Sequence, residues 1–276
     1  MPRFLVLDAY DRPARDKLQA AGASAAGDLY KNMLLHWRPE AEVEIAYSAD
    51  KSASIADLSA YDATFWTGSS LTIYHDAPEV TQQIDLAREA FRLGVPAFGS
   101  CWALQLACVA AGGTCRRNPK GREFGLARDI TLTAEGAAHP VFAGRQDRFM
   151  AFCSHLDEIE TLPQDASVLA GNHISRVQAA EIHHDQGVFF AQQYHPEYDF
   201  SEIAALSRFR AEGLIDDGFV ADGVGLQAYI ANCQALSDNP RDSDLRAGLQ
   251  ANDAVLDQKV RQNKVSNWLD LNFPKR

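Results

Sequence analysis

The 276-residue chain is acidic, with a formal net charge of −11 and a sequence pI near 5.1. An acidic chain repels phosphate backbones and anionic lipid, which argues against nucleic acids and membrane surfaces as partners. Its length allows one large α/β domain, or one such domain with a helical appendage. No stretch of the sequence approaches the roughly 20 apolar residues that span a bilayer.

The five cysteines are an odd number at irregular spacing, and no CxxC pair occurs. This pattern favours neither a disulfide framework nor a zinc site, and no metal or other cofactor is expected. The apolar run at the N-terminus is too short for the core of a signal peptide. These features together predict a reduced, cytoplasmic protein.

Strand-like and helix-like segments alternate over the first hundred residues. The predicted strands are residues 4–8, 43–47, 63–66 and 95–98, and helical spacing covers 14–37, with Gly22 and Gly27 interrupting it, and 80–93. Gly94 marks the end of the second helical stretch. Strands that alternate with helices predict a parallel sheet covered on both faces.

The second half of the chain changes character. Over residues 127–193 short β-like runs follow one another with turn residues between them, which predicts antiparallel additions to the same sheet. From residue 201 the pattern is helical to the end, with apolar residues such as Ile203 and Leu206 at helical spacing. We therefore predict one domain over 1–200 and a helical extension over 201–276. That extension would pack near the carboxyl ends of the strands and cap the pocket, or equally only buttress the domain.

Cys101 lies between a strand and a strongly apolar helix, in the sequence VPAFGSCWALQLACVAAGG. This is the strand–turn–helix layout of a nucleophile elbow. The helix N-terminus presents unpaired N–H groups and partial positive charge, which favour the thiolate form that attacks. The N–H of Trp102 is placed to bind a developing oxyanion. Taken alone, a buried structural cysteine is an equally good interpretation, and it is the one we expect for Cys108 and Cys115.

A second signal is the strand VFFAQQY, which runs into His195, Pro196 and Glu197. An elbow cysteine needs a base for its proton and a carboxylate to orient that base. His195 supplies the imidazole, and Glu197 is close enough in sequence to bond its far ring nitrogen. For this segment alone, a surface histidine beside a solvated glutamate is the alternative, and we expect His195 to be an exposed strand-end residue. An elbow cysteine and a strand-borne His-x-Glu in one α/β chain together favour a catalytic triad.

Six segments, in order, resemble the class I (triad) glutamine amidotransferases, particularly free-standing members similar to the amidotransferase domain of GMP synthase. The resemblance spans about residues 1–200 and implies a flavodoxin-like α/β fold, with a mixed, mostly parallel sheet and helices on both faces. The matching segments are Thr67-Gly68-Ser69-Ser70, GSCWALQ at 99–105, RNPKGREFG at 117–125, CSHLDEI at 153–159, GNHISRVQA at 171–179 and the Q-x-H-P-E at 193–197.

The resemblance also implies roles for individual residues. Cys101 would attack the amide carbon of glutamine, His195 would protonate the departing ammonia, and Glu197 would orient His195. The backbone N–H groups of Ser69 and Trp102 would form the oxyanion hole. A γ-glutamyl thioester would form and be hydrolysed by water. The expected substrate-binding residues are Gly68, Gln105, Ser154 and His155.

The chain departs from the family pattern at three places. Ala103 stands where the family usually has glycine, Leu104 replaces a frequent histidine, and residues 68–70 read Gly-Ser-Ser instead of Gly-Gly-Pro. Alanine is small, so we expect the elbow to survive with slightly tighter packing. A backbone oxyanion donor requires no particular side chain at its position.

Three functional hypotheses remain open, each with a small-molecule substrate or ligand. The sequence has neither GxxxxGK[ST] nor SGGxDS, so the first is a glutaminase or stand-alone amidotransferase whose synthetase or ammonia acceptor is a separate partner. The second is a γ-glutamyl amide or peptide hydrolase with the same triad, whose leaving group is an amine larger than ammonia. The third is a non-catalytic binding protein on this fold, against which an intact Cys-His-Glu set argues.

Overall fold

A mixed sheet forms the centre of the computed structural model, which describes residues 1–50 and 57–274. Within these residues the sheet has nine strands, in the order β2-β1-β3-β4-β11-β10-β9-β6-β7. The parallel half contains β1 (Arg3–Asp8), β2 (Glu42–Tyr47), β3 (Ala63–Trp66), β4 (Ala97–Ser100) and β11 (Gly187–Gln192). Antiparallel pairing adds β10 (Ala179–His184), β9 (Ala166–Gly171), β6 (Glu123–Leu132) and β7 (Arg148–His155). The predicted α/β class with a mixed sheet is confirmed.

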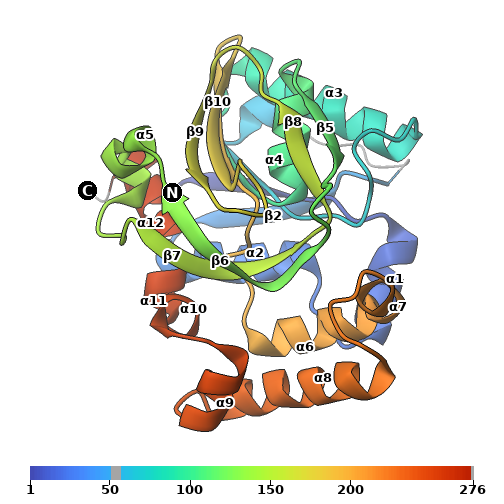
Figure 1. Ribbon diagram of the computed structural model, residues 1–276. Coiled ribbons are helices and arrows are strands. Elements are labelled where there is room, and N and C mark those ends of the chain that lie inside the picture. Colours follow the sequence, from blue (N-terminus) through green and yellow to red (C-terminus); the bar gives the residue numbers. More distant parts are fainter. Residues whose placement is uncertain (51–56, 275–276) are drawn as a thin grey trace.

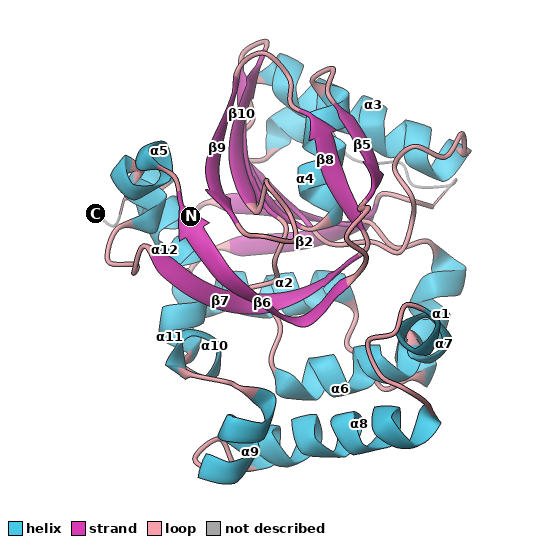
Figure 2. Cartoon of the chain, viewed as in Figure 1, coloured by secondary structure: helices cyan, strands magenta, loops and turns pink. Residues whose placement is uncertain are grey.

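Helices cover both faces of the parallel half, as Figure 1 and Figure 2 show. The helices α3 (Pro78–Leu93) and α4 (Trp102–Ala110) share a core with Leu5 and Leu7 of β1. On the opposite face, α2 (Ala26–Trp37) and α12 (Asn263–Asn272) share a core with Phe4 and Val6. Successive side chains of a strand point to opposite faces, so a strand buried on both sides is apolar throughout. This explains the run FLVL in β1.

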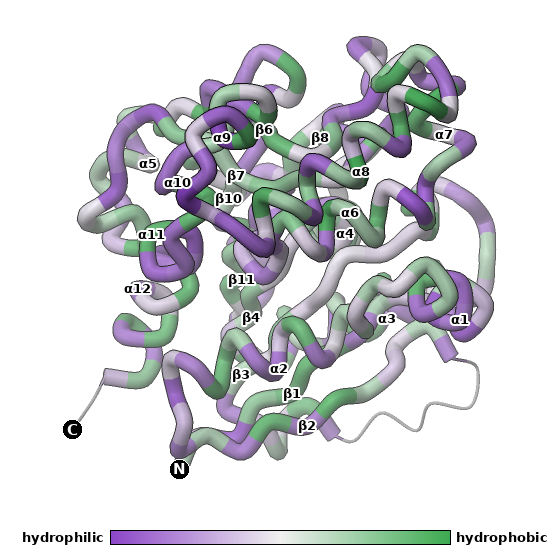
Figure 3. Tube along the Cα trace, turned by 90° about the horizontal axis from the view of Figure 1, so that it is seen from below, coloured by the Kyte–Doolittle hydropathy of each residue, from purple (hydrophilic) through white to green (hydrophobic). Residues whose placement is uncertain are grey.

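The chain after residue 199 is largely helical. Its elements are α6 (Phe200–Phe209), α7 (Ala211–Asp216), α8 (Gly223–Asp238), α9 (Ser243–Leu249), α10 (Asp253–Leu256), α11 (Gln258–Arg261) and α12. The helices α6 and α8 lie side by side below the sheet in Figure 1 and share a core with α1 (Arg12–Ala20). The last helix returns to the sheet, where the ring of Trp268 lies 5.3 Å from that of Phe65 and 5.7 Å from that of Phe98. The last described residues, Phe273 and Pro274, consequently lie on the same side of the molecule as Met1 and Pro2, with which they line a cavity. Figure 3 shows α12 and the start of the chain on that side.

The structure differs from the sequence-based expectation in local details. Gly22 interrupts the first helical stretch with a left-handed φ of +82°, but Gly27 lies inside α2, where its N–H donates to Asp8. The strands β5 (Thr114–Arg117) and β8 (Asp157–Thr161) form a separate two-stranded sheet that we did not predict. Three short helical turns complete the described elements: η1 (Leu58–Ala60), α5 (Ala134–Ala138) and η2 (Pro140–Phe142). None of the described helices is long and apolar enough to cross a membrane.

Candidate active site

Cys101 lies on a strained turn between β4 and α4. Its φ of +56° and ψ of −102° fall outside the regions that residues with a side chain usually adopt. The Cys101 N–H donates a 2.7 Å hydrogen bond to the carbonyl oxygen of Gln192, at the end of β11. This bond helps to hold the unfavourable conformation. The turn presents the thiol at the carboxyl end of the sheet, in front of the first turn of α4.

Gly99 explains how the elbow accepts alanine at position 103. A β-carbon at position 99 would lie 2.3 Å from the Cβ of Ala103 and 2.9 Å from the carbonyl oxygen of Trp66. The two positions face each other, so the missing side chain at Gly99 leaves room for the extra methyl group. The elbow therefore keeps its close strand–helix packing.

His195 and Glu197 follow β11 and form a buried hydrogen-bonded pair. The distance from His195 Nδ1 to Glu197 Oε1 is 2.6 Å. The ring of Tyr198 stacks on the imidazole, with centroids 4.0 Å apart and planes 6° apart. His195 is 1% exposed. The expectation of an exposed strand-end residue was therefore wrong, because Tyr198 and neighbouring segments enclose the ring.

Glu197 is itself held by the Ser100 hydroxyl, which in turn accepts from Tyr30. The Tyr30 and Ser100 hydroxyls lie 2.5 Å apart, and Ser100 Oγ donates to Glu197 Oε2 over 3.3 Å. Ser100 immediately precedes Cys101, so this hydrogen-bonded chain connects the elbow with the carboxylate. Neither Tyr30 nor Ser100 was among the site residues predicted from the sequence. The position of Ser100 next to the cysteine was the only signal for it.

The environment of His195 raises the pKa of its imidazole to about 9. Burial is the largest single influence and acts in the opposite direction, since it disfavours the charged ring. The charge of Glu197, its hydrogen bond to the ring and the neighbouring Cys101 together outweigh it. A β-carbon at position 68 would lie 3.7 Å from both His195 Nε2 and Cys101 Cβ, so the imidazole and the cysteine lie side by side.

A cavity of about 330 Å³ opens in front of Cys101. Its walls include five of the residues expected from the sequence: Ser69, Trp102, Gln105, Ser154 and His155. Gly68 lies behind this wall, against Cys101 and His195. The Ser69 hydroxyl donates to the carbonyl oxygen of Ala9 over 2.9 Å and accepts from the N–H of Leu71 over 3.2 Å. The hydroxyl is thus occupied, and a backbone N–H is the group left to bind an oxyanion.

Ser154 and His155 end β7 and line the same cavity as Cys101. The Cys101 sulfur lies 3.7 Å from the carbonyl oxygen of Ser154. The Ser154 hydroxyl is buried and has no hydrogen-bond partner in the part of the chain that the structure describes, so it is available to a ligand. His155 is already engaged, because its Nε2 lies 2.9 Å from Glu123 and its Nδ1 lies 3.1 Å from the carbonyl oxygen of Asp157. Both ring nitrogens of His155 therefore have partners, and the residue supports the cavity wall.

Comparison with known proteins decides the family. The chain matches the family model described as "Glutamine amidotransferase class-I" over residues 26–208, more than half of its length. It belongs to the class I glutamine amidotransferases. A γ-glutamyl-L-1-hydroxyisopropylamide hydrolase from a Pseudomonas species is 35% identical over 220 residues, which cover 78% of this chain and 74% of that protein. The glutamine-hydrolysing GMP synthase of Wolinella succinogenes is 33% identical over 119 residues, or 43% of this chain and 22% of that enzyme.

Solved structures show the same amidotransferase fold. A glutamine amidotransferase from Thermotoga maritima superposes with a TM-score of 0.65 at 17% identity, covering 98% of this chain and 97% of that one. A second, from Methylobacillus flagellatus, has a TM-score of 0.60 at 15% identity, with 96% and 94% covered. The match to the Wolinella GMP synthase lies within less than a quarter of that enzyme.

The amidotransferase cavity has a charged rim that sequence analysis missed. Arg117, Arg122 and Arg210 line it, as do Tyr74 and Asp157, whose side chains share a 3.0 Å hydrogen bond. Asp157 lies in the segment CSHLDEI, which the resemblance had marked. Arg117 and Arg122 belong to the segment RNPKGREFG, which the resemblance had also marked, whereas Arg210 lies between α6 and α7. No motif of the elbow or the His-Pro-Glu segment points to their shared location.

The helical tail of this amidotransferase meets the site at two places. Arg210, between α6 and α7, lines the Cys101 cavity, and Asp217 binds Arg117 and Arg122 over 3.2 and 2.7 Å. Farther along, Arg261 and Gln262 both donate to the carbonyl oxygen of Pro196, over 3.2 and 3.4 Å. The first contact borders the pocket, and the second braces the His-Pro-Glu segment.

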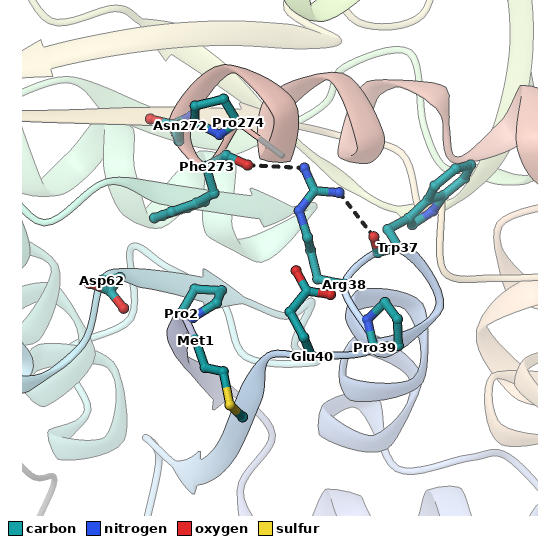
Figure 4. A pocket seen from close by; sticks show the side chains of 10 residues that line it. All are labelled: Met1, Pro2, Trp37, Arg38, Pro39, Glu40, Asp62, Asn272, Phe273 and Pro274. Carbon is teal, nitrogen blue, oxygen red and sulfur yellow. Dashed lines mark hydrogen bonds between the residues drawn. The ribbon is translucent and has the colours of Figure 1, made fainter. Parts of the chain in front are cut away.

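A larger cavity, of about 890 Å³, lies away from Cys101, near both ends of the chain (Figure 4). Arg38 is buried beside it and donates to the carbonyl oxygens of Trp37 and Phe273 and to Asp270. Neither cysteine nor histidine is among the described residues that line this cavity. Its size alone therefore does not make it a candidate for the amidotransferase chemistry.

Proposed function

We propose that this amidotransferase hydrolyses the γ-amide bond of glutamine or of a larger γ-glutamyl amide, through a thioester on Cys101. One observation carries the proposal: Cys101, on a strained elbow, lines a cavity, and Gly68 packs against both this cysteine and the imidazole of a buried His195–Glu197 pair joined over 2.6 Å. A nucleophile, a base and a group that orients the base are the parts that covalent acyl transfer requires.

In the first step, the Cys101 sulfur attacks the γ-carbonyl carbon and the carbonyl oxygen gains negative charge. The N–H of Trp102 is at the first position of α4, where it has no partner in its own helix, and with the N–H of Ser69 it stabilises that oxygen. The C–N bond then breaks as His195 transfers a proton to the leaving nitrogen. Ammonia or an amine departs, and a γ-glutamyl thioester remains.

In the second step, neutral His195 accepts a proton from water, which attacks the thioester carbon. The C–S bond breaks, glutamate leaves, and the thiolate is restored beside a protonated imidazole. Glu197 accepts the Nδ1–H of His195 and orients the ring through both steps. Gln105 and the unpartnered Ser154 hydroxyl bind the amino-acid end of the substrate.

A γ-glutamyl amide larger than glutamine is favoured by two observations. The Pseudomonas relative, named as a hydrolase of such an amide, matches about three quarters of both chains. In addition, a second cavity of about 520 Å³ adjoins the first and shares three of its lining residues, which provides room for a leaving group beyond ammonia. In this proposal, residues 201–276 form an extension of the 1–200 domain and complete the wall of the cavity in front of Cys101. Hydrolysis to glutamate does not require a partner synthetase.

The proposal is tested by glutamate release from a substrate panel. Purified protein is incubated with glutamine, a γ-glutamyl alkylamide and the corresponding α-glutamyl alkylamide. We expect release from at least one γ-linked substrate and from neither the α-linked one nor any substrate after Cys101→Ala. Cys108→Ala is the control, since that cysteine lies on the helix that follows Cys101 but does not line the cavity. Tight binding without any turnover would support the non-catalytic alternative instead.

A further inference from the structure

Arg210 borders both the Cys101 cavity and its 520 Å³ neighbour. The two cavities share Ser70, Arg122 and Arg210. Ser70 follows directly on Gly68 and Ser69, and Gly68 packs against His195. Since His195 must reach the leaving nitrogen, the passage between the cavities lies on the side where the amine departs.

Two of the three arginines on this rim are already paired. Arg117 and Arg122 both bind Asp217, so this carboxylate offsets part of their charge. Over residues 1–50 and 57–274 no carboxylate forms an ion pair with Arg210, and its Nε is enclosed without a hydrogen-bond partner. Burying part of a guanidinium whose Nε–H has no acceptor costs free energy, and an acceptor on a bound ligand would offset this cost.

Tyr10 is close enough to both Arg210 and Cys101 to feel their electrostatic influence. Burial raises the pKa of the Tyr10 phenol to about 12, with Arg210 opposing that rise and Cys101 adding to it. Both groups therefore act on the same buried ring. Exposed Arg208 lines the second cavity and adds a further positive charge, and exposed Glu212 opposes it.

We propose that Arg210 is a specificity-determining residue that binds a carboxylate on the leaving amine. The preferred substrates are then γ-glutamyl derivatives of amino acids or of similar amino carboxylic acids. A planar guanidinium matches a carboxylate with two parallel hydrogen bonds, which a neutral amide cannot accept equally well. This inference rests on the proposed function, because it concerns the leaving group of the same reaction.

The test compares two substrates that differ only in this charge, γ-glutamylglycine and γ-glutamylglycinamide. We expect the wild-type protein to favour the acid in kcat/KM by roughly ten- to hundredfold, as charge-assisted hydrogen bonds do. Arg210→Gln should bring the ratio close to one, and Arg210→Lys should restore part of it. Arg88→Gln is the matched control, because this arginine is exposed on α3 and lines neither cavity. Its ratio should equal that of the wild-type protein.

A wild-type ratio near one, or a ratio that Arg210→Gln leaves unchanged, overturns the inference. In that case continued hydrolysis of both substrates keeps the proposed function intact. The absence of glutamate release from every γ-linked substrate removes the proposed function, and this inference with it. If Arg210→Gln does not fold, binding of the two compounds to Cys101→Ala protein decides, with tighter binding of the acid as the expected result and equal binding as the contrary one.

Discussion

Gly68 packs directly against His195: a β-carbon at position 68 would lie 2.9 Å from the imidazole Cε1. The same carbon would lie 3.7 Å from Cys101 Cβ, so the loop after β3 passes close to both groups. Glycine is required here by this close approach, since any side chain would push against the proposed base. One methyl group added at position 68 would therefore change the distance between the imidazole of His195 and Cys101.

Gly68→Ala should therefore lower kcat/KM about ten- to hundredfold while the protein stays folded, because the imidazole must move away from its position beside the thiol. Steady-state kinetics and a thermal melt measure the two effects. Gly248→Ala is the matched control, since a β-carbon there meets no atom within 4 Å. Equal activity of the two variants would contradict this view of Gly68.

Cys101 should be the thiol that a glutamine-like diazo-ketone alkylates first. It lines the cavity, whereas the other four cysteines are buried elsewhere. Burial also raises the pKa of Cys153 and, to about 12, that of Cys233, so few thiolates form at these positions. Mass spectrometry of the labelled protein identifies the site. Labelling of Cys153 or Cys233 ahead of Cys101 would show that the nucleophile is assigned wrongly.

His195→Asn should abolish turnover and also destabilise the fold. The imidazole is buried against Tyr198, and its loss leaves the carboxylate of Glu197 enclosed with a weaker partner. Breaking a buried pair of this kind costs about 3–5 kcal/mol. Urea unfolding of the wild-type and variant proteins gives the difference. A variant that is inactive but fully stable would show that the pair adds little to folding, and an active variant would remove His195 from the mechanism.

Activity should fall as the pH rises through about 9, because deprotonated His195 cannot supply a proton to the leaving nitrogen. The folded-state pKa is raised above the ordinary value of about 6.5, so the protonated ring stabilises the fold fully below about pH 6.5. This stabilisation is lost as the pH passes through about 9. Glu197→Gln removes a charge that raises this pKa and should shift the alkaline limb of the rate profile to lower pH. If the alkaline limbs of the rate profiles were identical for the wild-type protein and Glu197→Gln, deprotonation of His195 would not be the cause of the loss of activity.

Trp268→Ala should destabilise the protein by about 3–5 kcal/mol, since the indole fills the space between Phe65 and Phe98 on one face of the sheet. Leu271→Ala on the same helix should change the free energy of unfolding by less than about 0.5 kcal/mol, because Leu271 is 49% exposed. Denaturant unfolding measures both. Similar effects of the two substitutions would mean that the packing of α12 on the sheet contributes little to stability.

Truncation after about Arg210 would remove the contact of Trp268 with the sheet, so the shortened chain is expected to aggregate.

Local patterns in the sequence determined much of this protein. The doubly buried run FLVL, the elbow around Cys101 and the segment from Gln193 to Glu197 each depend on residues close together in the chain. Alternation, helix stops and small residues at a turn act over a few residues, and a sequence displays them directly. These signals were sufficient for the α/β class with a mixed sheet, and for a cysteine and a histidine–glutamate pair that the fold brings close together.

Only the tertiary structure decided what surrounds those residues. The burial of His195, the contact of Gly68 with the imidazole, and the return of Trp268 to the sheet depend on segments that are far apart in the sequence. The arginine rim shows the same limit, because Arg117 and Arg122 meet Asp217 from about a hundred residues away. Ion pairs of this kind leave no periodic pattern, since each partner alone is an ordinary polar residue of a loop or a helix end. Their meeting is set by packing between distant elements, which the order of residues along the chain does not reveal.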